Sequence, residues 1–182
     1  MREEICVFCG ASPKVPQSHL DTGYAFGGKL SEHRFDLVYG GGGSGMMGAV
    51  ARGVRDGGGH ITGIIPHFLR EWEEAYEDID ELILTETMHQ RKAHMAERAQ
   101  QFVILPGGIG TLDEMCEIIT WFQLEVHAKP IHIVDFDGYW GPLLTMLQHI
   151  SDMGYLQSDY DNMFHIHDDI IGCMVKIEDL RP

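Results

Sequence analysis

The sequence predicts an α/β fold with a mostly parallel β-sheet that helices cover on both faces. Short apolar runs alternate with longer segments of helical periodicity along the 182 residues. The apolar runs contain few polar residues, as expected of strands that are buried on both faces. Glycine-rich turns follow several of these runs, which is typical of tight connections from a strand into a helix.

In the N-terminal half, turn residues mark the ends of the expected elements. The strands are followed by Gly10, Gly40 and Pro66, and the glycines 57–59 end the second helix. Glycine and proline interrupt regular structure because of their backbone geometry. The elements expected here are a strand over 5–9, a helix over 17–33, a strand over 36–39, a helix over 45–55 and a strand over 60–65.

The C-terminal half continues the alternation of strand and helix. Because helices connect successive strands, the strands should run parallel with right-handed crossovers, in a Rossmann-like three-layer sandwich. No linker or repeat divides the chain, so we expect one domain over 1–182. The remaining elements expected are an acidic loop or short helix over 71–78, strands over 81–84, 101–105, 131–135 and 162–166, and helices over 88–99, 112–124, 141–152 and 168–177.

Composition and charge exclude several classes of protein. No apolar run approaches the roughly 20 residues that span a bilayer, and we expect a cytoplasmic protein without a membrane partner. The formal net charge of -15 argues against a general nucleic-acid binder, which needs a basic face. An anionic substrate would therefore need a local positive pocket, for which Arg91, Lys92 and helix N-termini are the candidates.

Neither the cysteines nor the histidines form a complete metal motif. Cys6 and Cys9 form a C-x-x-C, but no second pair completes a zinc site, so we interpret them as reduced, packed cysteines. His165 and His167 can bind a metal only with a third ligand, which the sequence does not indicate. We expect no metal and no cofactor.

Residues 106–114, which read Pro-Gly-Gly-Ile-Gly-Thr-Leu-Asp-Glu, are the most informative stretch. They connect an expected strand to an expected helix. Glycines at such a turn let a ligand approach the backbone, while the first helical N–H groups and the helix dipole favour a phosphate. A carboxylate, Glu114, follows one turn into the helix. The combination indicates an enzyme that acts on a nucleotide.

A structural explanation of Glu114 stays open from the residues alone. Thr111 and Glu114 fit the S/T-x-x-E pattern of a capping box, in which the glutamate only caps the helix. The glycines before them favour the functional interpretation.

A second glycine-rich turn, 40–48, contains G-x-G-x-x-G at Gly43, Gly45 and Gly48. A dinucleotide site would need an acidic residue at the end of the next strand, where the chain reads Ile-Pro-His. One interpretation is that these glycines only permit close packing of a helix. We favour another, in which the loop lines a nucleotide site without dinucleotide specificity. No P-loop sequence is present, so kinase or ATPase chemistry has no support.

These motifs resemble those of the LONELY GUY (LOG) family of cytokinin riboside 5'-monophosphate phosphoribohydrolases. Residues 106–114 resemble its P-G-G-x-G-T-x-x-E motif, and 88–92 resemble its M-H-x-R-K motif. Residues 5–10 and 39–42 resemble its first two strands and turns. The similarity extends from about residue 3 to about residue 153.

The resemblance implies hydrolysis of the N-glycosidic bond of an adenine or cytokinin nucleoside 5'-monophosphate, which releases the free base and ribose 5-phosphate. It implies that Arg91 and Glu114 are catalytic. Either Glu71 or Glu74 can replace Glu73 after a small alignment shift. The substrate-binding residues it implies are Glu73, Lys92, Gly107, Gly108, Gly110, Thr111 and Thr120.

The family is usually dimeric, so a homodimer is expected, with a small nucleoside monophosphate as the substrate. It has often been labelled lysine decarboxylase, but no lysine here has the setting of a Schiff-base lysine. Two alternatives remain: a general nucleoside 5'-monophosphate (AMP) nucleosidase in salvage, and a non-catalytic nucleotide or molybdopterin carrier.

Overall fold

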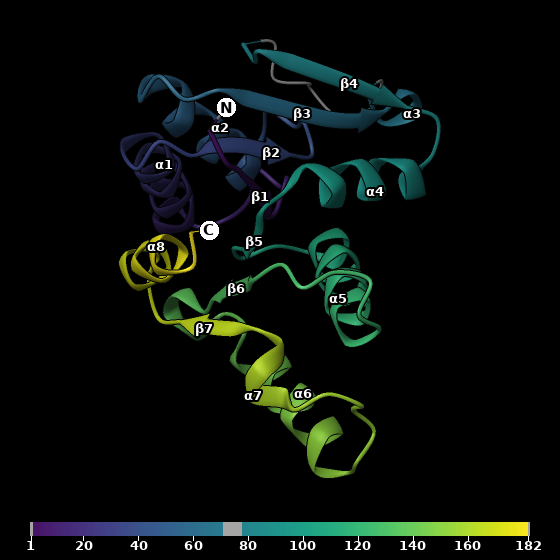
Figure 1. Cartoon of the computed structure of the whole chain (residues 1–182). Coiled ribbons are helices and arrows are strands. Elements are labelled where there is room, and N and C mark those ends of the chain that lie inside the picture. Colours follow the sequence, from purple (N-terminus) through teal and green to yellow (C-terminus); the bar gives the residue numbers. More distant parts are fainter. Residues whose placement is uncertain (1, 71–77, 182) are drawn as a thin grey trace.

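The computed structural model describes residues 2–70 and 78–181, and its centre is a seven-stranded sheet (Figure 1). The strand order is β4-β3-β2-β1-β5-β6-β7, and all paired strands are parallel. The strands are β1 (Glu4–Phe8), β2 (Asp36–Tyr39), β3 (Ile61–Pro66), β4 (Glu81–Thr85), β5 (Gln101–Ile104), β6 (Ile131–Val134) and β7 (His165–His167).

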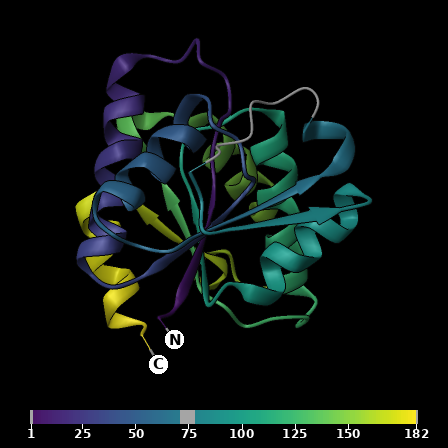
Figure 2. The same ribbon diagram turned by 90° about the horizontal axis from the view of Figure 1, so that it is seen from above.

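Helices cover both faces of the sheet, as the view from above shows (Figure 2). α1, α2 and α8 pack on one face through a core that includes Phe26, Val50 and Cys173, whereas α4 and α5 pack on the other through Met95 and Ile118. The helices are α1 (Gln17–Glu32), α2 (Gly45–Asp56), α3 (His67–Arg70), α4 (Met88–Arg98), α5 (Ile109–Gln123), α6 (Gly141–Asp152), α7 (Tyr160–Met163) and α8 (Ile170–Asp179).

The predicted α/β sandwich with helices on both faces is confirmed, and the sheet is parallel throughout. The last strand was predicted too early, because residues 160–163 form α7 and β7 begins only at His165. Asp159 caps α7 by accepting a hydrogen bond from the Asp161 N–H, which starts a helix where apolar residues suggested a strand. Residues 71–77 of the expected acidic segment lie outside the described residues.

The strand order places a crevice between β1 and β5. The chain adds β2, β3 and β4 on one side of β1 and then returns to place β5 on the other side. Ligands of open α/β sheets bind at such a reversal, outside the carboxyl ends of the strands. Within 2–70 and 78–181, no helix is long and apolar enough to cross a membrane.

Candidate active site

A pocket of about 480 Å³ lies at the carboxyl ends of β1 and β5. The turns after the two strands meet there, where the Gly10 N–H donates to the Pro106 carbonyl oxygen at 3.1 Å. The start of α4, the N-terminus of α5 and a residue after β6 form further parts of its wall. The predicted site residues that line it are Arg91, Gly107, Gly108, Gly110, Thr111 and Glu114.

Arg91 and Glu114 form a buried ion pair in this pocket. Arg91 Nη2 lies 3.6 Å from Glu114 Oε1, and the two residues are 4% and 6% exposed. Arg91 is in the first turns of α4, whose N-cap Thr87 accepts a hydrogen bond from the Gln90 N–H at 3.2 Å. The Arg91 Nε–H is buried, and among the described residues it has no hydrogen-bond partner. A bound anion or sugar oxygen would satisfy this donor.

Gly40 provides the space for the Arg91 guanidinium. A Cβ at position 40 would collide with Arg91 Nη2 and lie 3.2 Å from Cζ. The second glycine-rich turn therefore shapes the site through Arg91. Gly45 has a φ of +58° and packs against the backbone of Ala11, so the literal G-x-G-x-x-G includes a glycine that packing requires.

The glycines of the 106–110 turn have two different roles. A Cβ on Gly107 would collide with the Thr111 side chain, so packing requires this glycine. Within residues 2–70 and 78–181, no atom lies within 4 Å of a Cβ added to Gly108 or Gly110, and neither glycine has a positive φ. Gly110 is the second residue of α5, and glycine is up to about 1 kcal/mol less favourable than alanine in a helix. The open space over both glycines fits a ligand that approaches the backbone at the N-terminus of α5.

The geometry excludes the capping box. α5 begins at Ile109 with Gly108 as its N-cap, so Thr111 and Glu114 are the third and sixth helical residues. A capping box needs the threonine at the N-cap and the glutamate at the third position. Glu114 instead directs its carboxylate toward Arg91 from the interior of the helix.

Two other predicted binding residues lie outside the residues that line this pocket. Lys92 Nζ contacts Asp113 Oδ2 at 3.0 Å and Glu117 Oε1 at 3.1 Å, and so ties α4 to α5. Burial lowers the pKa of Lys92, but these two carboxylates raise it more, and the net shift is upward. Thr120 is exposed, and its hydroxyl donates to the Cys116 carbonyl oxygen at 2.7 Å.

Glu73, the remaining predicted binding residue, lies outside the described residues, as do its possible substitutes Glu71 and Glu74. The assignment of a substrate contact to any of the three stays a prediction.

The cysteines of the C-x-x-C are buried and free. Burial, the largest cause, and the Glu114 charge raise the thiol pKa of both Cys6 and Cys9. Reactive thiols need a lowered pKa. The geometry therefore favours packed cysteines, with Cys9 in the pocket wall.

Sequence reasoning missed Tyr139 and His19. Tyr139 lines the pocket, and its hydroxyl donates to the Gly107 carbonyl oxygen at 2.7 Å. His19 from α1 lies edge-on to the Tyr139 ring, with 5.8 Å between centroids. Tyr139 follows β6, so the rule that ligands gather at carboxyl ends of strands was the signal that pointed to it. Apolar residues, among them Val15, Met47 and Met88, form much of the remaining wall.

Comparison with known proteins agrees with the motifs. The family model described as "Possible lysine decarboxylase" matches residues 47–177. Cytokinin riboside 5'-monophosphate phosphoribohydrolase LOG7 of Arabidopsis thaliana is 46% identical over 85% of this chain and 71% of its own length. Probable cytokinin riboside 5'-monophosphate phosphoribohydrolase LOGL9 of Oryza sativa subsp. japonica is 41% identical over 98% of this chain and 78% of its own length.

Among solved structures, the molybdenum cofactor carrier protein of Chlamydomonas reinhardtii has a TM-score of 0.76 over 99% of this chain and 98% of that chain. It is 19% identical, so the likeness concerns the fold alone. The family model and the relatives together show that this chain belongs to the LOG family of cytokinin riboside 5'-monophosphate phosphoribohydrolases, the family whose model is described as possible lysine decarboxylase.

Proposed function

We propose that the protein hydrolyses the N-glycosidic bond of adenine and cytokinin nucleoside 5'-monophosphates, releasing the free base and ribose 5-phosphate. The observation that carries the proposal is the buried Arg91–Glu114 pair, which shares one pocket with the glycines at the N-terminus of α5. Relatives that are 46% and 41% identical carry the name of this activity.

The N-terminus of α5 binds the 5'-phosphate in this proposal. The N–H groups of its first turn have no intrahelical acceptor, and the helix dipole adds partial positive charge there. Open space over Gly108 and Gly110 admits the phosphate oxygens. Because the phosphate fixes the substrate away from the reacting bond, its binding energy supports orientation at the ribose. A nucleoside without phosphate should therefore be a poor substrate.

Glu114 and Arg91 act at the ribose. Cleavage of the N-glycosidic bond develops positive charge on the ring carbon and oxygen, in an oxocarbenium-like transition state. The Glu114 carboxylate stabilises this charge and orients or deprotonates the attacking water. Arg91 keeps its proton, so its role is to position the substrate and control charge. Positioned general base catalysis typically contributes ~10²–10⁴-fold.

The remaining predicted residues have secondary roles. Lys92 orders the site by tying α4 to Asp113 and Glu117 on α5, so that Arg91 and Glu114 face each other. Thr111 packs under Gly107 and supports the 106–110 turn, which binds the phosphate in this proposal. Thr120 and Glu73 stay predicted substrate contacts.

Decarboxylation with pyridoxal phosphate does not fit the residues. That chemistry needs a lysine in the pocket to form a Schiff base. The described residues that line the pocket include no lysine. Lys129 donates instead to the Ala96 and Glu97 carbonyl oxygens, at 2.6 Å and 3.1 Å.

An assay with a panel of nucleotides tests the proposal. AMP, GMP, CMP and isopentenyladenosine monophosphate are incubated with the protein, and the free base is followed by chromatography. Adenosine serves as the control without phosphate. We expect base release from the two adenine nucleotides and much less from adenosine. Equal turnover of all four nucleotides would favour the general nucleosidase, and no release by folded protein would favour the carrier.

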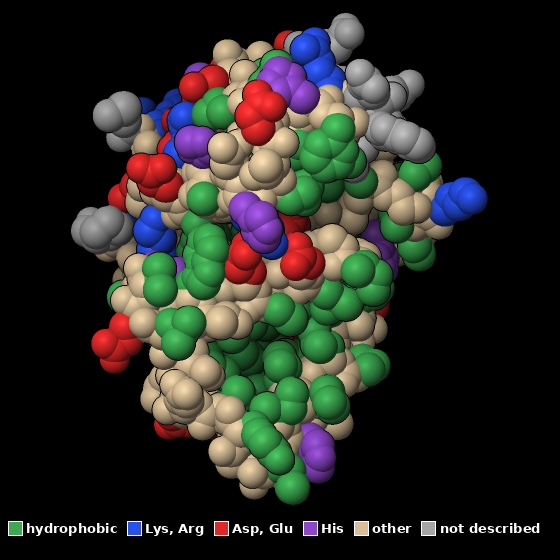
Figure 3. Space-filling model, turned by 90° about the vertical axis from the view of Figure 1, so that its right-hand side faces the viewer, with side chains coloured by type: hydrophobic (Ala, Val, Ile, Leu, Met, Phe, Trp, Pro, Cys, Tyr) green, Lys and Arg blue, Asp and Glu red, His purple; other side chains and the backbone are tan. Residues whose placement is uncertain are grey.

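We also propose that the chain works as one cytoplasmic domain and forms a homodimer. Figure 3 shows hydrophobic side chains gathered around a hollow on one face of the molecule. Leu124 and Val126, after α5, are 58% and 66% exposed, and Met146 on α6 is 55% exposed. Such apolar exposure is typical of an interface. Light scattering should give twice the chain mass, and Val126→Glu should shift it toward the monomer.

A further inference from the structure

A row of polar side chains crosses three neighbouring strands beneath α8, away from the nucleotide pocket. Gln101 of β5, His132 of β6 and His167 of β7 form a continuous chain of hydrogen bonds. Gln101 and His132 are 1% and 0% exposed. Because the strands are parallel and in register, these side chains share one face of the sheet. Burying polar groups costs free energy unless they are hydrogen-bonded, so their presence on an otherwise apolar face needs a specific explanation.

The hydrogen bonds fix the proton positions. Gln101 Nε2–H donates to the Ile177 carbonyl oxygen at 3.0 Å, which directs Gln101 Oε1 toward His132. His132 Nε2–H donates to this oxygen at 2.9 Å, so His132 Nδ1 carries a lone pair. That lone pair points to His167 Nε2 at 3.0 Å. With its proton on Nε2 and a lone pair on Nδ1, His132 is neutral in this arrangement, as a metal ligand must be.

Cys173 from α8 brings a thiol to the same point. His132, His167 and Cys173 each offer a ligand atom, and these atoms lie within 4.8 Å of one another. Cys173 is fully buried. A thiol must lose its proton to become a metal ligand, so binding at Cys173 is coupled to proton release.

We propose that His132 Nδ1, His167 Nε2 and Cys173 Sγ bind one Zn²⁺ ion. Zinc prefers imidazole nitrogen at about 2.0–2.1 Å and thiolate sulfur at about 2.3 Å, in tetrahedral geometry. These bond lengths place the ligand atoms roughly 3.3–3.6 Å apart. The two histidine nitrogens are 3.0 Å apart, and the three ligand atoms lie within 4.8 Å of one another, which is compatible with such a site. Gln101 holds the second nitrogen of His132, as outer partners of zinc-bound histidines do.

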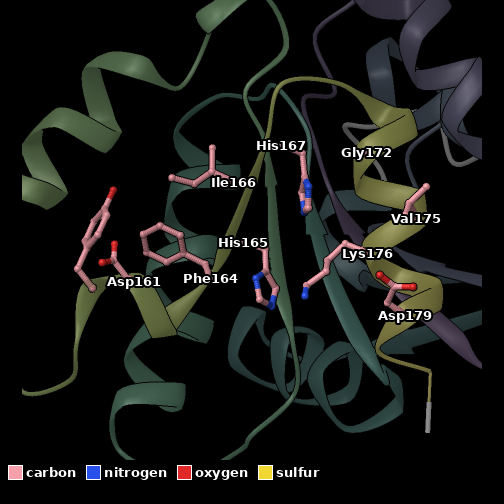
Figure 4. Close-up of a pocket in the computed structure, with 10 residues that line it drawn as sticks. Asp161, Phe164, His165, Ile166, His167, Gly172, Val175, Lys176 and Asp179 are labelled. Atoms are coloured by element: carbon pink, nitrogen blue, oxygen red, sulfur yellow. The ribbon is translucent and has the colours of Figure 1, made fainter.

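Of the three proposed ligands, His167 lines a pocket of about 540 Å³, and we place the fourth ligand on that side. Figure 4 shows His165 and His167 on the side of β7 toward α8, while Ile166 points away. Lys176 and Asp179 of α8 also line this pocket and bring opposite charges to it. Water reaches the ion from here and completes the tetrahedron.

Binding releases one proton for each ion. The Cys173 thiol loses its proton to solvent as the Zn–S bond forms. His167 moves its proton from Nε2 to Nδ1, which releases nothing. The ion joins α8 to β6 and to the edge strand β7, which has three residues. None of its ligands lines the nucleotide pocket, so this site does not depend on the proposed hydrolase activity.

Titration of metal-free full-length protein tests the site, with Zn²⁺ and with Co²⁺ as a spectroscopic probe. We expect one ion per chain, thiolate-to-Co²⁺ charge-transfer absorption and release of about one proton per ion. Zn²⁺ at about 100 times its dissociation constant should raise Tm by about 5–10 °C. Binding without the thiolate band, or at several ions per chain, would overturn the proposal.

Matched variants separate ligation from nonspecific binding. Cys173→Ser and His167→Gln should each weaken Zn²⁺ binding by at least ~100-fold, because each removes a direct ligand. Cys116→Ser and His149→Gln change residues outside the group and should bind Zn²⁺ as the parent does. Circular dichroism verifies that each variant is folded. Because His167 is only half-buried, its substitution should disturb the fold less than that of the buried Cys173. Unchanged affinity in folded His167→Gln contradicts the assignment.

Discussion

The Tyr139 hydroxyl donates a hydrogen bond to the Gly107 carbonyl oxygen at 2.7 Å. The described chain contains no cis peptide, so the Gly108 N–H points opposite to this carbonyl. By holding this carbonyl in place, Tyr139 fixes the direction of the Gly108 amide at the N-terminus of α5. Residues 32 positions apart in the chain thus set the geometry of the 106–110 turn, which we propose binds the phosphate.

Tyr139→Phe should lower kcat/KM for the nucleoside monophosphate by about 2- to 10-fold, because a hydrogen bond contributes about 0.5–1.5 kcal/mol. The loss should occur mainly in KM, and turnover of the nucleoside without phosphate should not change. Steady-state kinetics with AMP and adenosine measure both. Tyr24→Phe is the matched control, since the Tyr24 hydroxyl donates to Asp56 on α2, outside the pocket. Equal losses with both substrates would contradict a role at the phosphate.

Glu114→Gln should lower kcat by at least ~10²-fold, because an amide cannot stabilise a cationic sugar or accept a proton from water. The fold should be kept, since glutamine fills the same volume and its oxygen can still accept a hydrogen bond from Arg91. Stopped assays give kcat, and thermal denaturation gives Tm. Glu97→Gln, at an exposed position of α4, should leave both unchanged. A large fall in Tm with little loss of rate would support a purely structural Glu114.

Gly110→Ala should make the protein more stable and less active. The new methyl group meets no atom of the described residues within 4 Å, and alanine in a helix gains up to about 1 kcal/mol over glycine. The same methyl group occupies the space that the phosphate needs, so KM for AMP should rise. Gly28→Ala in α1 also adds a methyl group to open space and should stabilise without any kinetic effect. Unchanged KM in Gly110→Ala would argue against a phosphate at this turn.

Gly40→Ala should impair catalysis through Arg91, because its Cβ would occupy the place of the guanidinium. A double-mutant cycle with Arg91→Ala isolates this coupling. Alone, Gly40→Ala should lower kcat/KM about 10-fold or more, since displacing a charged hydrogen-bonding group costs more than about 1.4 kcal/mol. In the Arg91→Ala background it should have almost no further effect. Additive losses would show that Gly40 acts on something other than Arg91.

His127→Gln should reduce the loss of stability in mild acid. His127 Nδ1 accepts from the Lys129 N–H at 3.1 Å, and its Nε2 contacts the Ile118 carbonyl oxygen at 2.9 Å. Burial, the largest cause, and Lys129 lower the pKa of His127, while the Ile118 contact raises it less. The unfolded chain therefore binds the proton more readily, and stability falls as pH drops below about 6.5.

Urea denaturation at about pH 7.5 and pH 5.5 measures this effect. The slope from one group is at most about 1.4 kcal/mol per pH unit, and smaller here because His127 is only half-buried. His94→Gln on the exposed face of α4 is the control and should keep the parent slope. If His127→Gln lost stability more steeply than the parent as the pH falls, the effect would have the opposite sign, and a lowered pKa of His127 would be refuted.

The local sequence pattern was sufficient to predict the strands other than the last one, and to identify the motifs that carry the candidate catalytic residues. Apolar runs ending at Gly10, Gly40 and Pro66 predicted β1, β2 and β3 to within a residue or two, because such turns depend on nearby residues. The prediction of the last strand failed because Asp159 caps α7 and so decides where this helix starts. Arg91 and Glu114 were named from motifs alone, and the fold brings them within 3.6 Å.

The sequence by itself determined the α/β alternation, the family motifs and the glycine turn, since each depends on residues that lie close together along the chain. Only the tertiary structure decided that Glu114 pairs with Arg91 instead of capping its helix, that Tyr139 supports Gly107, and that His132 and Cys173 join His167. The physical reason is that strand order and helix packing bring these side chains together across long sequence separations, and no local periodicity encodes such contacts.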